Sequence, residues 1–111
     1  TKEYIEEQPG LDYVVELVGT KDFDFEQKFV ALLKAEFTSD LGEYLYHIRI
    51  DEPRAAAEIV HRIKYKLSVL GMERAFAFAE MHKERLHLGD KSFDSDFKGI
   101  LKTISNFLET V

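Results

Sequence analysis

Apolar residues recur every three or four positions along most of the chain, and this spacing constrains the fold class most strongly. Within residues 24–49 the positions that follow it are Phe25, Phe29, Leu33, Phe37, Leu41, Leu45 and Ile48. A period near 3.6 residues places them on one face of an α-helix. No segment alternates apolar and polar residues over the length of a strand. The pattern predicts an all-α protein with these residues facing the core.

A second long helix is predicted over residues 53–70. Pro53 suits a first turn, Asp51 or Glu52 suits the N-cap, and Gly71 lies where a glycine commonly ends a helix. The side chains expected to point inward are Ala56, Ile59, Val60, Ile63, Leu67 and Leu70.

Two further helices follow in the C-terminal part of the chain. One runs from about Met72 to Leu86 and is ended by Gly89, and Ser92 or Ser95 is expected to cap the other. The last helix has an apolar stripe made of Phe97, Ile100, Leu101, Ile104, Phe107, Leu108 and Val111.

The N-terminal region is expected to contribute less. Residues 1–10 are interpreted as a lead-in, with Glu6 and Glu7 in solvent. Residues 11–18 are predicted to form a short helix stopped by Gly19. Asp22 or Asp24 is expected to cap the helix over 24–49.

Four long helices with short links predict an antiparallel four-helix bundle, up-down-up-down, with the short additional N-terminal helix across one end. At 111 residues the chain has the size of one domain, assigned to residues 11–111. No apolar seam of the coiled-coil type is sustained, so we expect a monomer.

Composition excludes several classes of function. Without cysteine there is neither a disulfide framework nor a Cys-based metal site. The excess of 21 acidic over 15 basic residues argues against a nucleic-acid partner. No apolar run reaches the roughly 18 residues of a membrane span, and the polar N-terminus is not a signal peptide. These features favour a cytoplasmic protein with no membrane partner.

His61 does not fit the core pattern of its helix. At about 100° per residue, Ile59, Ile63 and Leu70 cluster on one side and His61 lies opposite them. The residues predicted to share its exposed face are Arg54, Ala57, Glu58, Lys64, Tyr65 and Ser68. Two of these are small and would leave the imidazole accessible, so the face suits the docking of a partner. The alternative is an ordinary surface histidine without a role.

The segment 57–71 resembles the signature of histidine-containing phosphotransfer (HPt) domains. That signature is a histidine, a lysine three residues later, usually a glycine directly after the lysine, and a Leu-Gly pair at the helix end. The matching positions are His61, Lys64, Leu70 and Gly71. Tyr65 stands where the family usually has glycine. The resemblance extends over about residues 22–110.

The resemblance implies a phosphorelay intermediate of two-component signal transduction. His61 would accept a phosphoryl group through Nε2 from an aspartate of a response-regulator receiver domain and pass it to another receiver. Lys64 would support the phosphoryl group electrostatically. The receiver would contact Arg54, Ala57, Glu58, Tyr65 and Ser68 and would supply the magnesium ion. Arg62 and Lys66 are expected to steer the partner.

No glycine-rich phosphate loop is present, so we expect neither ATP binding nor autokinase activity, and no cofactor. The chain would be a carrier rather than an enzyme.

A helical oligomerisation module is disfavoured because no coiled-coil seam is sustained. Two other functions are alternatives to the carrier. The first is an HPt-like helical interaction module that is never phosphorylated. The second is a metal enzyme, which the spacing of His47, His61, His82 and His87 disfavours because no two lie four residues apart on one helix. Glu58 and His61 form one Glu-x-x-His pair, but on the outer face. His82 falls within an apolar stripe and is expected at the edge of the core.

Overall fold

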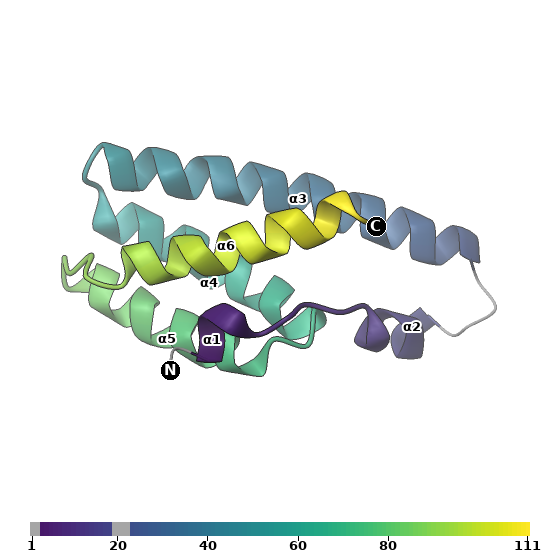
Figure 1. The fold of residues 1–111 in the computed structure, drawn as a ribbon. Coiled ribbons are helices and arrows are strands. Elements are labelled where there is room, and N and C mark those ends of the chain that lie inside the picture. Colours follow the sequence, from purple (N-terminus) through teal and green to yellow (C-terminus); the bar gives the residue numbers. More distant parts are fainter. Residues whose placement is uncertain (1–2, 19–22) are drawn as a thin grey trace.

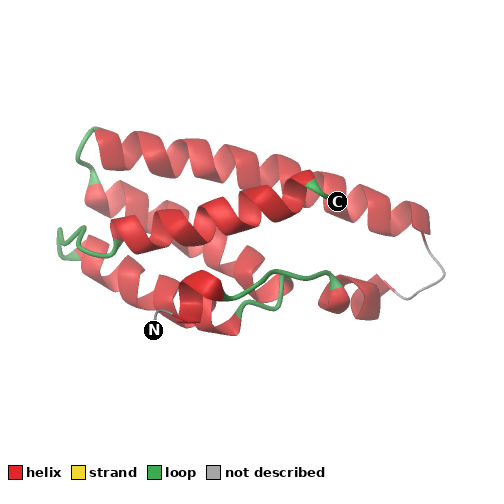
Figure 2. Cartoon of the chain, in the orientation of Figure 1, coloured by secondary structure: helices red, strands yellow, loops and turns green. Residues whose placement is uncertain are grey.

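In the computed structural model, residues 3–18 and 23–111 are described, and all regular secondary structure within these ranges is helical (Figures 1 and 2). The helices are α1 (Glu3–Glu6), α2 (Asp12–Val18), α3 (Phe23–Arg49), α4 (Pro53–Val69), α5 (Glu73–His87) and α6 (Asp94–Glu109). The all-α class is confirmed. None of the helices in the described part is long and apolar enough to cross a membrane.

The four longer helices follow one another with a reversal of direction at each turn (Figure 1). α4 packs against both α3 and α5, and α6 packs against α5. The chain end that follows α6 is also tied to α3, because Lys34 Nζ donates to the Val111 carbonyl at 2.7 Å. These contacts are consistent with the predicted antiparallel arrangement. The core cluster draws on all four helices, including Phe37, Val60, Phe78 and Ile104.

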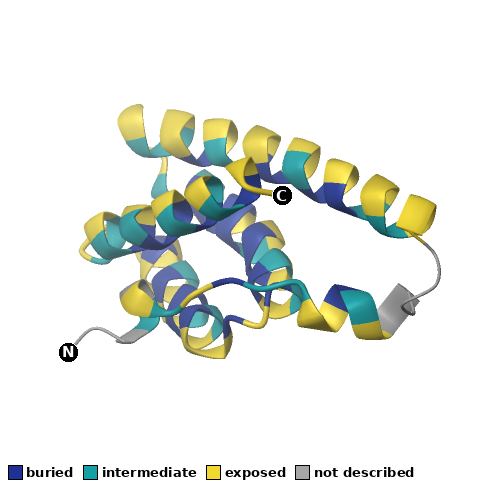
Figure 3. Cartoon of the chain, turned by 45° about the vertical axis from the view of Figure 1, so that its right-hand side comes forward, coloured by how far each residue is buried: buried dark blue, intermediate teal, exposed yellow. Residues whose placement is uncertain are grey.

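α3 is longer than the helices that cover it. Some residues of its apolar stripe are therefore exposed, although they were predicted to face the core. It has 27 residues, about 40 Å, whereas α4 has 17. Its first turns therefore extend past α4, and Phe25 is 51% exposed (Figure 3). Leu45, also expected in the core, is 41% exposed beside α6. Leu33 and Phe37 are buried as predicted.

The C-terminal ends of α4 and α5, which glycines terminate, were predicted correctly. Gly71 and Gly89 adopt positive φ angles of 73° and 82°, which favour glycine and end α4 and α5. Gly19 and Asp22 lie outside the described residues. Asp24 lies inside the first turn of α3 rather than ahead of it.

The predicted serine cap of α6 is wrong. The N-cap positions of α4, α5 and α6 are Glu52, Met72 and Phe93, and none makes a side-chain capping hydrogen bond. Ser92 precedes the N-cap and Ser95 lies within the helix.

The first turn of α5 is capped from the N-terminal segment instead. Glu7 accepts hydrogen bonds from the backbone N–H groups of Arg74 at 3.1 Å and Ala75 at 2.9 Å. A carboxylate at this end also complements the helix dipole. Glu7 is therefore a structural residue, contrary to the expectation that it is solvated.

The N-terminal residues do more than lead into the domain. The Tyr4 ring stacks on Phe78 with centroids 4.1 Å apart, and its hydroxyl donates to Asp96 at 3.0 Å. The Gly10 N–H donates to the Leu70 carbonyl at 2.9 Å. α1 thereby bridges α5 and α6, while α2 packs against α3 (Figure 1).

A buried polar cluster joins α3, α5 and α6. The Tyr44 hydroxyl donates to Asp94 Oδ1 at 2.6 Å and lies 2.8 Å from Nε2 of His82. The hydroxyl has one hydrogen, so Nε2 must donate to the tyrosine oxygen. Nδ1 of His82 is then a buried acceptor without a partner among residues 3–18 and 23–111. His82 is fully buried rather than at the core edge.

Burial makes this cluster sensitive to pH. Desolvation lowers the pKa of His82 from 6.5 to about 4. Burial, reinforced by Asp94, raises the pKa of Tyr44. Between pH 6.5 and 4 the unfolded chain therefore binds a proton at His82 that the folded chain does not.

Acidification should weaken the fold through His82. We expect the unfolding free energy to fall by about 3 kcal/mol through this residue when the pH is lowered from 7 to 4. Urea titrations across this range should show a shallower pH dependence for His82→Leu. The control is His87→Leu at an exposed position, which should keep the wild-type slope. Equal slopes for wild type and His82→Leu would contradict the assignment.

Candidate functional site

α4 presents His61 at the boundary between its buried and exposed sides. Ile59, Ile63 and Leu70 are buried, as predicted. His61 is partly exposed rather than fully exposed, because it leans toward α5. Its Nδ1 atom lies 3.5 Å from Nζ of Lys83, a long and weak hydrogen-bonding contact.

The predicted exposed face of α4 is narrower than expected. Ala57 is fully buried and Lys64 is only 8% exposed, which corrects the expectation that both lie in solvent. The helical wheel assumed one inward side, whereas α4 packs between α3 and α5 and buries two. Ala57 therefore cannot take part in a docking surface as the structure stands.

The other predicted contact residues are accessible. Arg54, Glu58, Tyr65 and Ser68 are exposed. Tyr65 meets His61 edge to face, with ring centroids 5.4 Å apart and planes at 89°. At 56% exposure, its ring flanks the imidazole on the solvent side. The structure thus brings Tyr65 and His61 together and leaves Arg54 and Ser68 toward the two ends of the helix.

Lys64 is bound by a carboxylate from α5. Its ammonium donates a hydrogen bond to Glu80, and it also lies over the rings of Tyr65 at 5.2 Å and Phe76 at 5.8 Å. The hydrogen bond to Glu80 raises the pKa of Lys64, and the same bond lowers the pKa of Glu80. Both groups are charged near neutral pH, and the charge of Lys64 is largely compensated.

Glu80 also contacts a second lysine. Lys83 Nζ lies 3.6 Å from Glu80 Oε2, one turn away on α5. Glu80 therefore stands between two ammonium groups, of which Lys83 is the one beside His61. A lysine ammonium can only donate hydrogen bonds, so Nδ1 of His61 is the acceptor and Nε2 carries the proton in this arrangement.

Sequence reasoning missed Glu80 and Lys83. The detectable feature is their spacing, since an acid and a base three residues apart share one side of a helix. Nothing local indicates that this side faces His61, because the contact depends on how α5 packs against α4.

The basic residues beside His61 in sequence turn toward α3. Arg62 pairs with Asp40 at 3.0 Å and also with Glu43. Lys66 pairs with Asp40 at 3.2 Å and with Glu36 at 3.5 Å. These pairs compensate the charges that were expected to steer a partner.

Metal ligation finds no support in the described residues. No group of three or more His, Asp or Glu side chains there is placed to hold an ion. His47 Nδ1 instead lies 3.0 Å from Glu52. His87 is exposed in the last turn of α5, where a cation suits the helix dipole.

The chain matches no protein-family model, no curated protein and no solved structure. The site must therefore be interpreted from its own geometry.

Removing the charge of Glu80 should destabilise the fold through Lys64. Glu80→Gln leaves a mostly buried ammonium without its counter-ion, which we expect to cost about 1–3 kcal/mol of unfolding free energy. Glu84→Gln is the matched control, because Glu84 is exposed one turn further along α5. Urea denaturation should separate the two variants. Equal stability would show that the pair with Glu80 does not hold Lys64.

Proposed function

We propose that the chain is an HPt-like phosphorelay carrier, built on an antiparallel four-helix bundle, with His61 as the phosphoryl acceptor. The donor is an aspartyl phosphate on a receiver domain, and a second receiver takes the group onward. The observation that carries the proposal is a partly exposed imidazole in the middle of α4 with the Lys83 ammonium 3.5 Å from one ring nitrogen. We further propose that the carrier acts in the cytoplasm as a monomer.

The transfer needs a nitrogen lone pair aimed at phosphorus. The P–N bond forms as the P–O bond to the aspartate breaks and the aspartate leaves as a carboxylate. The phosphorylated ring is then an imidazolium. It loses the proton on its other ring nitrogen to water. Transfer to the next aspartate reverses these steps. The main protein contributions are alignment and nearby positive charge.

The contact with Lys83 bears on which nitrogen attacks. While Lys83 donates to Nδ1, the proton sits on Nε2, and neither nitrogen offers a free lone pair to a partner. Attack through Nε2 therefore requires Lys83 to turn away and the proton to move to Nδ1. Once freed, the Lys83 ammonium can approach the phosphoryl oxygens. We assign the electrostatic support first to Lys83, with Lys64 acting through the shared carboxylate of Glu80.

One observation favours the second candidate, an interaction module that is never phosphorylated. Tyr65 fills the position beside His61 where the HPt signature usually has glycine, and Lys64 is already bound to Glu80. Such a module would use the surface formed by Tyr65 and Ser68 without chemistry at His61.

Phosphorylation by a receiver domain should occur at His61. Phosphoramidate, which phosphorylates accessible histidines without a protein donor, should label His61 in the wild type, and His61→Ala should lose this labelled site. The label should be labile in acid and stable in base. His87→Ala, which removes an exposed histidine outside the site, should keep it. ³¹P NMR would report whether Nε2 carries the group.

Receiver domains charged with acetyl phosphate test the relay itself. Labelled phosphoryl should pass to wild type and His87→Ala, and His61→Ala should take up none. If phosphoramidate labels His61 in folded protein but no receiver in a broad panel does, the carrier proposal fails and the interaction module remains.

Tyr65 should control which receivers gain access. Tyr65→Gly is expected to raise the transfer rate or change the preferred receiver, because the partner's backbone can then approach His61. Glycine inside a helix also costs about 1 kcal/mol relative to alanine. Tyr65→Ala therefore serves as the companion variant, which removes the ring and keeps helix propensity. An unchanged rate profile for both variants would remove Tyr65 from the docking surface.

A further inference from the structure

A groove runs between α3 and α6, on the surface of helices that do not carry His61. It has a volume of about 330 Å³ and is lined by Leu41, Leu45, Lys98, Leu101, Lys102, Ser105 and Asn106. All of these residues belong to α3 or α6. The groove is thus separate from the site on α4 and α5.

The floor of the groove is aliphatic. Leu101 is buried, Leu41 is half-buried, and Leu45 is 41% exposed although it belongs to the apolar stripe of α3. Leu41 and Leu45 are one helical turn apart. Together with Leu41, the exposed part of Leu45 gives the groove an aliphatic surface that another molecule can contact.

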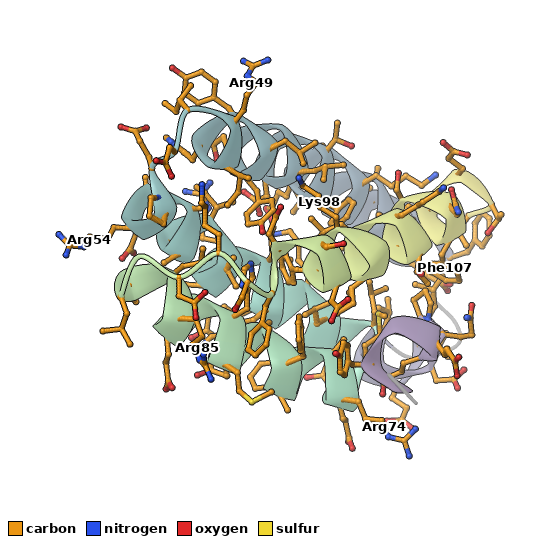
Figure 4. All side chains as sticks on the ribbon, turned by 60° about the vertical axis from the view of Figure 1, so that its left-hand side comes forward. Arg49, Arg54, Arg74, Arg85, Lys98 and Phe107 are labelled. Carbon is orange, nitrogen blue, oxygen red and sulfur yellow. The ribbon has the colours of Figure 1, made fainter. Side chains whose placement is uncertain are left out.

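The rim of the groove is basic. Lys98 lies between α3 and α6 (Figure 4) and pairs with Asp94 at 2.9 Å. Lys102, one turn further along α6, is exposed and makes no ion pair with any described residue. Among the described residues, no acidic side chain lines the groove. Because Asp94 compensates Lys98, Lys102 supplies the unpaired charge of this rim in a chain of formal net charge −6.

On each wall of the groove two like residues lie one helical turn apart. These are leucines on α3 and lysines on α6. An amphipathic helix places apolar anchors at the same spacing when it lies in a groove between two helices. Acidic residues flanking those anchors would meet Lys102, which has no ion-pair partner among the described residues. We propose that this α3–α6 groove binds an acidic amphipathic helix of a partner protein. The inference is independent of phosphotransfer at His61.

A pair of synthetic peptides tests the proposal. Both are helix-forming sequences of about 18 residues, roughly five turns, with leucines one turn apart. One carries glutamates around the leucines and the other carries lysines at the same positions. Fluorescence anisotropy gives the affinities, and ¹⁵N–¹H NMR spectra of the full chain locate the binding site.

The acidic peptide should shift the backbone amides of Leu41, Leu45 and Lys102. It should bind at least about tenfold more tightly than the basic peptide, a difference of 1.4 kcal/mol. Lys102→Glu should weaken the acidic peptide and strengthen the basic one. Lys28→Glu is the control, with the same charge change at an exposed position of α3 about 20 Å before Leu41 along the helix axis.

Several outcomes would overturn the proposal. One is equal binding of the two peptides, and another is amide shifts that fall outside the groove. A third is an equal effect of Lys28→Glu and Lys102→Glu, which would indicate attraction to overall charge. Groove amides that shift with protein concentration alone would assign the groove to a second copy of this chain instead.

Discussion

The packing of α4 between α3 and α5 determines what the candidate site can be. With a neighbour on each side, α4 buries a wide arc and leaves a narrow exposed strip. Ala57 and Lys64 fall within the buried arc, whereas Glu58, Tyr65 and Ser68 lie on the strip. His61 lies on the border, where its ring meets Lys83 of α5 and Tyr65 and stays partly exposed. A residue in that position is both restrained by the fold and accessible to a partner.

The same packing sets the electrostatics around His61. Glu80 reaches from α5 to Lys64 and approaches Lys83, so two ammonium groups share one carboxylate. On the α3 side, Asp40 is shared by Arg62 and Lys66. These cations near the histidine each have a carboxylate neighbour. An incoming anionic group would have to compete with Glu80 for Lys83, which makes Glu80 as relevant to the chemistry of this site as either lysine.

Local sequence patterns predicted the features that depend on neighbours within one or two turns. The helical stripes, the inward positions of α4 and the glycines that end α4 and α5 belong to this group. The features that were missed depend on residues distant in the chain. Glu7 caps α5 from a position 68 residues before Ala75, and Lys83 reaches His61 across an interhelical contact. A helical wheel also contains no information on how many neighbours a helix has, so it misplaced Ala57 and Lys64.

Net charge describes this surface poorly because its charges are unevenly compensated. The formal value of −6 averages over ion pairs that acids on α3 and α5 form with Arg62, Lys64 and Lys66 of α4. On α6, Lys102 has no such partner among the described residues. Unpaired charge attracts a partner more effectively than paired charge, since no internal ion pair must break first. By this argument Lys102 contributes an unpaired positive charge to the α3–α6 groove, whereas Lys98 is already paired with Asp94.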